Sequence, residues 1–233
     1  MSNININHFK KENINSNYFK PLKYYIKSSS NNCNTGSGFF EKKRRIIAIG
    51  DIHGDFESLL YALFKAKCIN LNGDWIGKDT VVVQLGDILD RGGRSVSIDS
   101  ENETEELDII QFLEEIHKEA IKQGGAVYSL LGNHELMNIL GDFRYTTENT
   151  NNGFKINEDN LNYNRESLFK IGGPLAKKIA CHTYAIIQIG DWVFVHAGIL
   201  PKHITNNSIE SINKLVKDII LGKKDKTKLT ENE

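Results

Sequence analysis

The sequence predicts an α/β protein, and three observations support that fold class. Four short apolar runs, at residues 45–49, 80–85, 126–131 and 192–195, are typical of buried strands. A segment with helical periodicity separates the first two runs, so the order strand, loop, helix, strand indicates a βαβ unit. At 233 residues and 39% hydrophobic content, the chain is long enough for one substantial core and too short for two ordinary enzyme domains.

Two helices are predicted in the first half of the chain. The first, over residues 56–68, has apolar residues at three- and four-residue spacing, which places them on one face. The second follows an acidic, polar loop at residues 94–103, with Thr104 as its expected N-cap and Gly124 as its expected stop. Acidic residues in its first turn suit the positive end of the helix dipole. These residues are Glu105, Glu106 and Asp108.

The second half of the chain predicts an insertion, a hairpin and a last helix. Residues 149–164 are polar and rich in Asn, which favours a surface insertion. Strands at 183–189 and 192–195 flank Gly190-Asp191, a pair typical of a tight hairpin turn. An amphipathic helix is predicted over residues 209–221, with Ser208 as N-cap and Gly222 just beyond its end.

The composition divides the chain into three parts. Residues 1–44 are rich in Asn, Ser and Lys and have almost no periodic apolar pattern, so they are expected to form a disordered extension. Residues 45–222 are expected to form the single catalytic domain, and residues 223–233 a charged tail.

Charge and cysteine usage restrict the partners and the compartment. The formal net charge of −1 provides no field that would draw the protein to nucleic acid or to a membrane surface. Neither a run of 18 apolar residues nor an apolar signal core is found, which favours a soluble, cytoplasmic protein. Cys33, Cys68 and Cys181 are odd in number and widely spaced, as is typical of a reducing compartment, and Cys68 and Cys181 are expected to be small buried apolar residues.

Four polar motifs directly follow the four predicted strands. They are Gly-Asp-Ile-His-Gly at 50–54, Gly-Asp-Ile-Leu-Asp-Arg-Gly at 86–92, Gly-Asn-His-Glu at 132–135 and His-Ala-Gly at 196–198. Because ligands at successive strand ends converge at one edge of a sheet, these motifs predict a metal site. Oxygen and nitrogen donors without thiolate fit Mn, Fe or Zn and argue against a structural zinc site. The candidate ligands are Asp51, His53, Asp87, Asn133 and His196.

These motifs resemble those of the calcineurin-like metallophosphoesterases, and the second and third resemble the phosphoprotein phosphatase branch. Residues 136–145 and 172–176 are similar to the Shewanella-like protein phosphatases, and the resemblance covers residues 45–201. It implies a four-layer sandwich of two mixed β-sheets flanked by helices. It also implies metal-dependent hydrolysis of phosphomonoesters, with phosphoproteins carrying phosphoserine or phosphothreonine as substrates.

The resemblance also assigns roles to individual residues. Asp51, His53 and Asp87 would hold one divalent ion, and Asp87, Asn133 and His196 a second, with a hydroxide bridging the two. His134 would act as the general acid, Asp90 would orient its imidazole, and Arg91 would clamp the phosphoryl oxygens. For Arg144 and Arg165 two interpretations remain, a further phosphate contact or a surface salt bridge.

The sequence departs from the family pattern after residue 196. The family carries a further metal-ligating His and a further phosphate-binding Arg downstream, whereas here His203 is the sole later His and no Arg follows Arg165. The C-terminal part of the fold is therefore expected to be incomplete, unless His203 or His182 replaces the absent ligand. Two alternative functions stay open, a diadenosine-tetraphosphate hydrolase and an inactive phosphate-binding pseudophosphatase.

Overall fold

Two β-sheets form the centre of the computed structural model, which describes residues 9–27, 36–92, 105–147, 164–205 and 207–227. The parallel sheet has the strand order β2-β3-β4-β5, and each neighbouring pair in it is parallel. The mixed sheet has the order β1-β6-β7, with β1 parallel and β7 antiparallel to β6. The strands are β1 (Phe39–Phe40), β2 (Ile46–Ile49), β3 (Val81–Gln84), β4 (Ala126–Leu130), β5 (Thr183–Tyr184), β6 (Ile186–Ile189) and β7 (Trp192–Val195).

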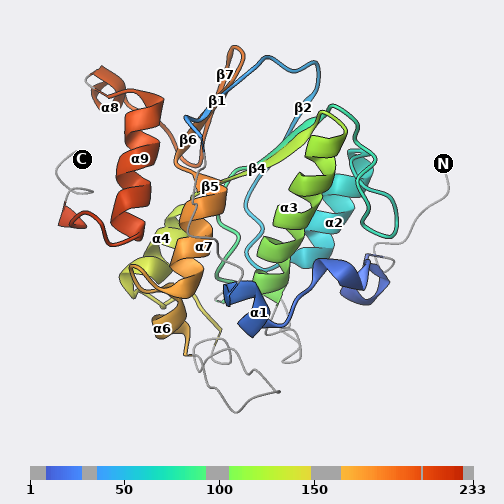
Figure 1. Cartoon of the computed structure of the whole chain (residues 1–233), viewed down its shortest axis with the longest axis horizontal. Coiled ribbons are helices and arrows are strands. Elements are labelled where there is room, and N and C mark those ends of the chain that lie inside the picture. The colour runs from blue at the N-terminus through green and yellow to red at the C-terminus, as the bar shows by residue number, and fades with distance from the viewer. Residues whose placement is uncertain (1–8, 28–35, 93–104, 148–163, 206, 228–233) are drawn as a thin grey trace.

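Helices cover the outer faces of both sheets, as Figure 1 shows. On the parallel sheet, α2 (Phe56–Lys65), α3 (Glu105–Lys122) and α7 (Pro174–His182) share one core cluster with the sheet. On the mixed sheet, α9 (Ile209–Ile220) packs against β6. The remaining α-helices of the described residues are α1 (Leu22–Lys27), α4 (Asn133–Leu140), α6 (Arg165–Phe169) and α8 (Pro201–Thr205). The expected α/β sandwich of two sheets flanked by helices is confirmed, although only the three-stranded sheet is mixed.

The sequence of the central strand β3 is a continuous apolar run because both faces of the strand are buried. Val82 belongs to the core beneath the helices, whereas Val81 and Val83 belong to the core between the two sheets. Successive side chains of a strand point to opposite faces, so a strand buried on both faces has no polar side to alternate with. The inter-sheet core also contains Ile187 and Ile189 of β6, which holds the mixed sheet against the parallel one.

The predicted strand at residues 183–189 divides into two strands that belong to different sheets. Residues Thr183–Tyr184 join β4, and Ile186–Ile189 join β1 and β7. The side chain of Asn213 accepts hydrogen bonds from the backbone N–H groups of Ala185 and Ile186, at 2.9 and 3.1 Å, where the chain leaves one sheet for the other. The buried backbone of this crossing is therefore satisfied by a side chain of α9.

The local predictions at helix ends and turns are largely met. Ser208 caps α9 by accepting from the N–H of Ser211 at 3.1 Å, and Gly222 follows the helix with φ of 74°. Gly190 has φ of 58° in the hairpin turn between β6 and β7. The first helix was expected to extend to Cys68 but ends at Lys65, because the chain turns at Lys67 with φ of 55°. Thr104 and most of the predicted insertion lie outside the described residues.

The expectation of a disordered extension over residues 1–44 is wrong for residues 9–27 and 36–44. The first of these ranges forms η2 (Lys11–Asn13), η3 (Ser16–Tyr18) and α1, and it lies beside α2 and α3 in Figure 1. Phe9, Tyr18 and Tyr25 are buried there. The hydroxyl groups of the two tyrosines explain how a polar segment can pack, since Tyr18 donates to Glu119 at 2.8 Å and Tyr25 donates to Glu114.

The cysteines behave differently from one another. Cys68 is a free and fully buried residue, as expected, and burial raises the pKa of its thiol. Cys181 was expected to be a small buried apolar residue but is partly buried and disulfide-bonded, which contradicts the expectation of reduced cysteines. Cys33 lies outside the described residues. Among the described helices, none has the length and apolar character needed to cross a membrane.

Candidate active site

The five predicted ligands lie together at the carboxyl edge of the parallel sheet. Asp51 and His53 follow β2, Asp87 follows β3, and Asn133 begins α4 just after β4. The Nε2 atom of His53 lies 3.8 Å from a carboxylate oxygen of Asp51 and 3.8 Å from one of Asp87. The expected convergence of the strand ends is therefore observed for the loops of this sheet.

His196 reaches the same place from the mixed sheet, at the end of β7. Its Nε2 atom lies 3.4 Å from a carboxylate oxygen of Asp87 and 2.9 Å from Oδ1 of Asn133. Its Nδ1 atom lies 2.8 Å from the carbonyl oxygen of Leu85. A backbone carbonyl at Nδ1 fixes the ring orientation and leaves Nε2 free to act as a ligand.

The donor atoms form two groups that could each hold a metal ion. One consists of His53, Asp87 and His134, and the other of Asp51, Asp87 and His196. Asp87 belongs to both groups, and a carboxylate with two oxygens is the side chain suited to contact two cations. The donors are carboxylate and imidazole, with the Asn133 carboxamide beside them, a set that fits divalent ions such as Mn, Fe or Zn. The residues present therefore fit a pair of divalent metal ions.

The ligand loops adopt an unusual backbone conformation. His53, Asp87 and Asp90 have φ of 47°, 55° and 69°, in the left-handed region that non-glycine residues rarely adopt. Among the described residues only two other non-glycine residues, Lys67 and Lys78, share this property. Such conformations are costly and cluster at functional sites, so the loops are held in place by the surrounding structure.

Two glycines allow the ligand loops to approach each other closely. A Cβ atom on Gly132 would lie 2.2 Å from Oδ1 of Asp87 and 2.4 Å from its backbone nitrogen. A Cβ atom on Gly86 would lie 2.7 Å from the backbone nitrogen of Gly132. Because real Cβ atoms do not approach other atoms so closely, any side chain here would push the Asp87 loop away from the Asn133 loop.

Glu135, the last residue of the third motif, connects the Asp87 loop and the Asn133 loop through its side-chain carboxylate. Its carboxylate accepts hydrogen bonds from the backbone N–H groups of Asp87, Ile88, Leu89 and Gly132, at 2.8 to 3.1 Å. Glu135 is 1% exposed, and burial raises the pKa of its carboxyl group although these N–H bonds favour the charged form. Glu135 thus fixes the loop that carries Asp87, a role that its place in the motif did not predict.

His134 and Asp90 form the expected pair beside the ligands. The Nδ1 atom of His134 lies 2.8 Å from Oδ2 of Asp90, and its Nε2 atom lies 3.9 Å from the Asp87 carboxylate. Asp90 is fully buried, and burial raises the pKa of its carboxyl group against the opposing effects of Asn138, His134 and Arg165. The ring of Tyr145 packs 5.2 Å from that of His134.

The three candidate arginines lie in different environments. Arg91 is partly exposed and its guanidinium lies 3.7 Å from the Asp55 carboxylate, at the start of α2. Arg144 is largely exposed and pairs with Asp142 at 2.6 Å, which matches the surface salt bridge. Arg165 fits neither of its two interpretations, because it is 1% exposed and its guanidinium points to Asp90 and Glu106.

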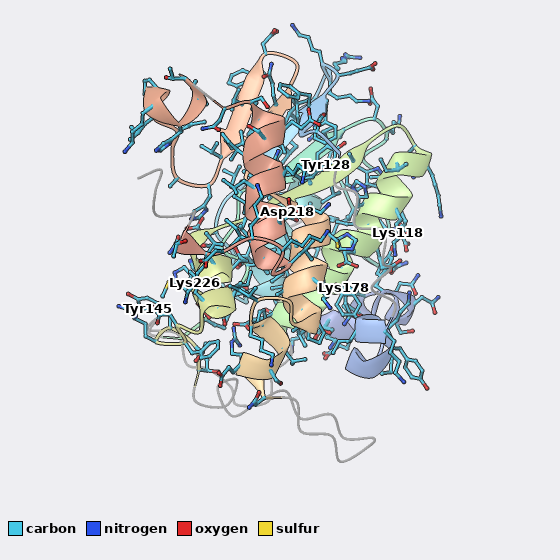
Figure 2. All side chains as sticks on the ribbon, turned by 60° about the vertical axis from the view of Figure 1, so that its left-hand side comes forward. Lys118, Tyr128, Tyr145, Lys178, Asp218 and Lys226 are labelled. Atoms are coloured by element: carbon cyan, nitrogen blue, oxygen red, sulfur yellow. The ribbon has the colours of Figure 1, made fainter. Side chains whose placement is uncertain are left out.

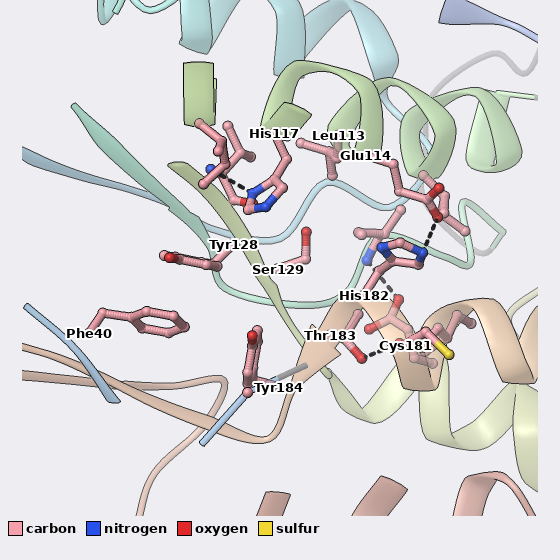
Figure 3. A pocket seen from close by; sticks show the side chains of 17 residues that line it. Phe40, Leu113, Glu114, His117, Tyr128, Ser129, Cys181, His182, Thr183 and Tyr184 are labelled. Carbon is pink, nitrogen blue, oxygen red and sulfur yellow. Dashed lines mark hydrogen bonds and ion pairs between the residues drawn. The ribbon is translucent and has the colours of Figure 1, made fainter. Parts of the chain in front are cut away.

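The other histidines among the described residues, His117, His182 and His203, lie outside both metal-competent groups. His117 and His182 line a separate cavity of about 480 Å³ at the edge of β4 and β5, shown in Figure 3. His117, which was expected to be solvated, is partly buried with Nδ1 2.7 Å from the Val127 carbonyl, and burial lowers its pKa. His182 lies 3.5 Å from Glu114. Nδ1 of His203 accepts a hydrogen bond from the backbone N–H of Leu200, just before α8, at 3.2 Å. Within the described residues, neither His182 nor His203 belongs to a metal-competent group.

Comparison with known proteins decides the family. The model of the calcineurin-like phosphoesterases matches residues 44–230. The chain belongs to this family. Divalent metal ions are implied by that membership, in agreement with the two metal-competent groups.

Individual relatives of this calcineurin-like phosphoesterase narrow the resemblance. The chain is 35% identical over 220 residues to Shewanella-like protein phosphatase 2 of Arabidopsis thaliana, covering 78% of this chain and 53% of the relative. It is 36% identical over 169 residues to Shewanella-like protein phosphatase 1 of Plasmodium berghei, covering 72% of this chain and 42% of the relative. The chain thus spans about half the length of the curated relatives it matches.

Solved structures support the same fold. A cold-active protein tyrosine phosphatase matches with a TM-score of 0.67 and 25% identity, over 83% of this chain and 52% of that chain. A second structure, of the cold-active protein tyrosine phosphatase of a psychrophilic Shewanella species, matches with a TM-score of 0.64 and 26% identity, over 78% of this chain and 51% of that chain. The phosphoesterase sandwich is therefore shared with these proteins.

Proposed function

We propose that this calcineurin-like phosphoesterase hydrolyses phosphomonoesters in phosphoproteins, with serine or threonine as the leaving group. The observation that supports the proposal is the position of the His134–Asp90 pair, in which Nε2 of His134 lies 3.9 Å from the Asp87 carboxylate that both metal-competent groups share. A proton donor placed against a site for phosphate-binding cations is what hydrolysis of an alkyl phosphate requires.

In this proposal the ligands divide between two ions. Asp51, His53 and Asp87 would hold one, and Asp87, Asn133 and His196 would hold the other, with Asp51 also within reach of the group that contains His196. When bound, such ions neutralise charge on the phosphoryl oxygens and make water a stronger nucleophile at neutral pH. The backbone hydrogen bonds to Nδ1 of His53 and His196 keep both imidazoles turned with Nε2 toward the Asp87 carboxylate.

The protein groups carry the remaining steps. His134 donates a proton from Nε2 to the departing alkoxide oxygen, because an alkoxide of Ser or Thr is too basic to leave unprotonated. Asp90 accepts from Nδ1 and stabilises the charged imidazole. Arg91 lies on the loop after Asp90 and can rotate from Asp55 toward the phosphoryl oxygens, which its planar guanidinium can bind through two parallel hydrogen bonds.

The leaving-group dependence of His134→Ala tests this assignment. The variant should lose about 100-fold or more in kcat on a phosphoserine peptide but much less on p-nitrophenyl phosphate, because a nitrophenolate leaves without a proton. Metal content, measured on the same protein, should equal that of the wild type. A uniform loss on both substrates, or loss of metal, would instead make His134 a ligand of the group that contains His53 and Asp87.

A substrate panel tests the proposed substrate class. Phosphoserine, phosphothreonine and phosphotyrosine peptides and diadenosine tetraphosphate are compared with Mn at one concentration and pH. We expect the serine and threonine peptides to have the highest kcat/KM. Preference for phosphotyrosine would align the chain with the cold-active tyrosine phosphatases, and a tenfold preference for the dinucleotide would overturn the phosphoprotein assignment. Metal binding without turnover of any substrate would indicate a phosphate-binding module.

A further inference from the structure

Arg165 is the most deeply buried cationic side chain among the described residues. It is the first residue of α6, is 1% exposed, and lies 75 residues from Asp90 in the sequence. Its guanidinium makes a separate polar contact with each of three buried side chains. Nε donates to Oδ1 of Asn138 at 2.6 Å, one terminal nitrogen donates to Oδ1 of Asp90 at 3.2 Å, and the other lies 2.8 Å from the Glu106 carboxylate.

These contacts fix the carboxylate of Asp90 in one orientation. Asn138 donates from Nδ2 to both carboxylate oxygens, at 2.9 and 3.0 Å, and Arg165 holds Oδ1 from another direction. Glu106 also accepts from the backbone N–H of Asp90 at 2.8 Å. The free direction of Oδ2 is thereby turned to His134 Nδ1. Since rotation of the carboxylate would break several of these bonds at once, the position of Oδ2 is determined by residues behind it.

The charge of Arg165 is needed as well as its geometry. Two acidic side chains, Asp90 and Glu106, are buried within contact of this single cation. Removing one partner of a buried ion pair leaves an uncompensated charge, which the protein relieves by protonation or by local rearrangement. Either change would remove the acceptor that faces His134. A guanidinium suits this place because its planar fork donates in several fixed directions, whereas an ammonium is a point charge.

We infer that Arg165 is a positioning residue for proton transfer: it holds Asp90 so that His134 keeps its proton on Nδ1 and presents Nε2 to the substrate. The inference rests on the proposed function, because it gives Arg165 a purpose through the general acid. Arg165 does not touch substrate, and it lies behind the site rather than in it. Arg165 directly follows the predicted insertion in the sequence, and in the structure it contacts Asp90 of the catalytic pair.

The kinetic test uses Arg165→Met and Arg165→Lys. We expect Arg165→Met to lower kcat on a phosphoserine peptide about 10- to 100-fold, a loss typical of residues that support a catalytic group. On p-nitrophenyl phosphate the loss should be within about threefold, with KM unchanged on both substrates. Arg165→Lys keeps the charge and protects against unfolding, and it should show the same selectivity with a smaller loss. Equal losses on the two substrates for the lysine variant would overturn the inference.

The matched control is Lys178→Met, which removes another buried cation. Lys178 lies on α7, 3.9 Å from the Glu114 carboxylate, and Figure 2 shows it well separated from Tyr145 near the site. Its loss should destabilise the fold without changing the ratio of the two rates. If Lys178→Met changes that ratio as much as Arg165→Met does, the effect reflects general loosening and the inference fails.

A second readout does not depend on turnover. In the metal-free chain, the ¹⁵N chemical shifts of the His134 ring report which nitrogen carries the proton. We expect one tautomer, with the proton on Nδ1, in the wild type, and a mixture of tautomers in both Arg165 variants. An unchanged tautomer in Arg165→Lys and Arg165→Met would refute the inference. If the wild type hydrolyses neither substrate, the proposed function fails, and these resonances alone still decide whether Arg165 positions His134.

Discussion

In the parallel sheet, three neighbouring strands end at one edge, and Asp51, Asp87 and Asn133 follow those ends directly. In the mixed sheet, only β7 reaches the site, and it contributes His196. The ligands of the parallel sheet are placed by the hydrogen bonds between its strands. The position of His196 depends on how the two sheets pack, through the inter-sheet core that contains Ile187 and Val83. The geometry of the candidate metal centre thus depends both on hydrogen bonds within the parallel sheet and on packing between the two sheets.

The largest effect should come from the residue that both metal-competent groups share. Asp87→Asn removes one negative charge from both groups, so we expect affinity at both metal sites to fall on the order of 100-fold. Metal analysis after dialysis and titration with Mn measure the two affinities. Asp51→Asn is the control, and it should weaken mainly one site. Equal metal retention by the Asp87→Asn protein and the wild type would show that Asp87 does not bridge.

The close approach of the parallel-sheet loops can be disturbed without removing a ligand. Gly132→Ala should lower the free energy of unfolding by about 1 to 3 kcal/mol, because the new Cβ atom overlaps with Asp87. Metal affinity should fall with it. Gly50→Ala is the matched control, since no atom lies within 4 Å of the added Cβ, and its effect should stay within about 0.5 kcal/mol. Urea unfolding measures both, and equal stability of the two variants would contradict the close contact.

The contribution of the mixed sheet can be separated from that of the parallel sheet. His196→Ala should weaken one metal site about tenfold and leave the other close to its wild-type affinity, because His53 and Asp51 stay in place on the parallel sheet. Isothermal titration with Mn distinguishes the two sites. Loss of both sites in this variant would mean that the sheets do not contribute independently.

The smallest effect concerns the edge of the parallel sheet at acid pH. Burial, and then Lys178, lower the pKa of His182 to about 4, from its ordinary value of 6.5. The unfolded chain therefore binds a proton between pH 6.5 and 4 that the folded chain does not, so stability should fall as the pH falls through this window. His182→Gln should reduce the drop in Tm between pH 7 and pH 4.5. His203→Gln on α8 is the control, and an equal reduction there would contradict the assignment.

The sequence predicted that the candidate ligands converge, and for four of them the physical reason is simple. Asp51, His53, Asp87 and Asn133 follow strands of the parallel sheet, and the carboxyl ends of parallel strands lie at one edge. His196 follows the antiparallel strand β7, so that rule does not place it. The residues behind the site follow no such rule. Asn138 lies one helical turn after His134 on α4, a spacing that could have indicated it, whereas nothing in the sequence relates Arg165 to Asp90. The approach of α6 to that helix is decided by packing.

The same distinction holds for the fold. The bounds of periodic segments such as α9 were predicted to within one residue, because their apolar residues recur at three- and four-residue spacing. The change of sheet at Ala185 was missed, since only this one residue, and no turn residue such as Gly or Pro, separates β5 from β6. The N-terminal segment was missed because its few buried residues are widely spaced among Asn and Lys, and its packing partners lie in distant helices.

That N-terminal segment changes what counts as the smallest folding unit of this protein. A chain cut to residues 45–222, the span that the motifs indicate, would leave the faces of α2 and α3 uncovered where Phe9 contacts Phe64 and Tyr18 contacts Phe112. It would also leave the buried carboxylate of Glu114 without the hydroxyl of Tyr25. Recombinant versions of this phosphoesterase domain should therefore begin before Phe9, so that the aromatic residues of the N-terminal segment stay part of the domain although they lie outside the span of the motifs.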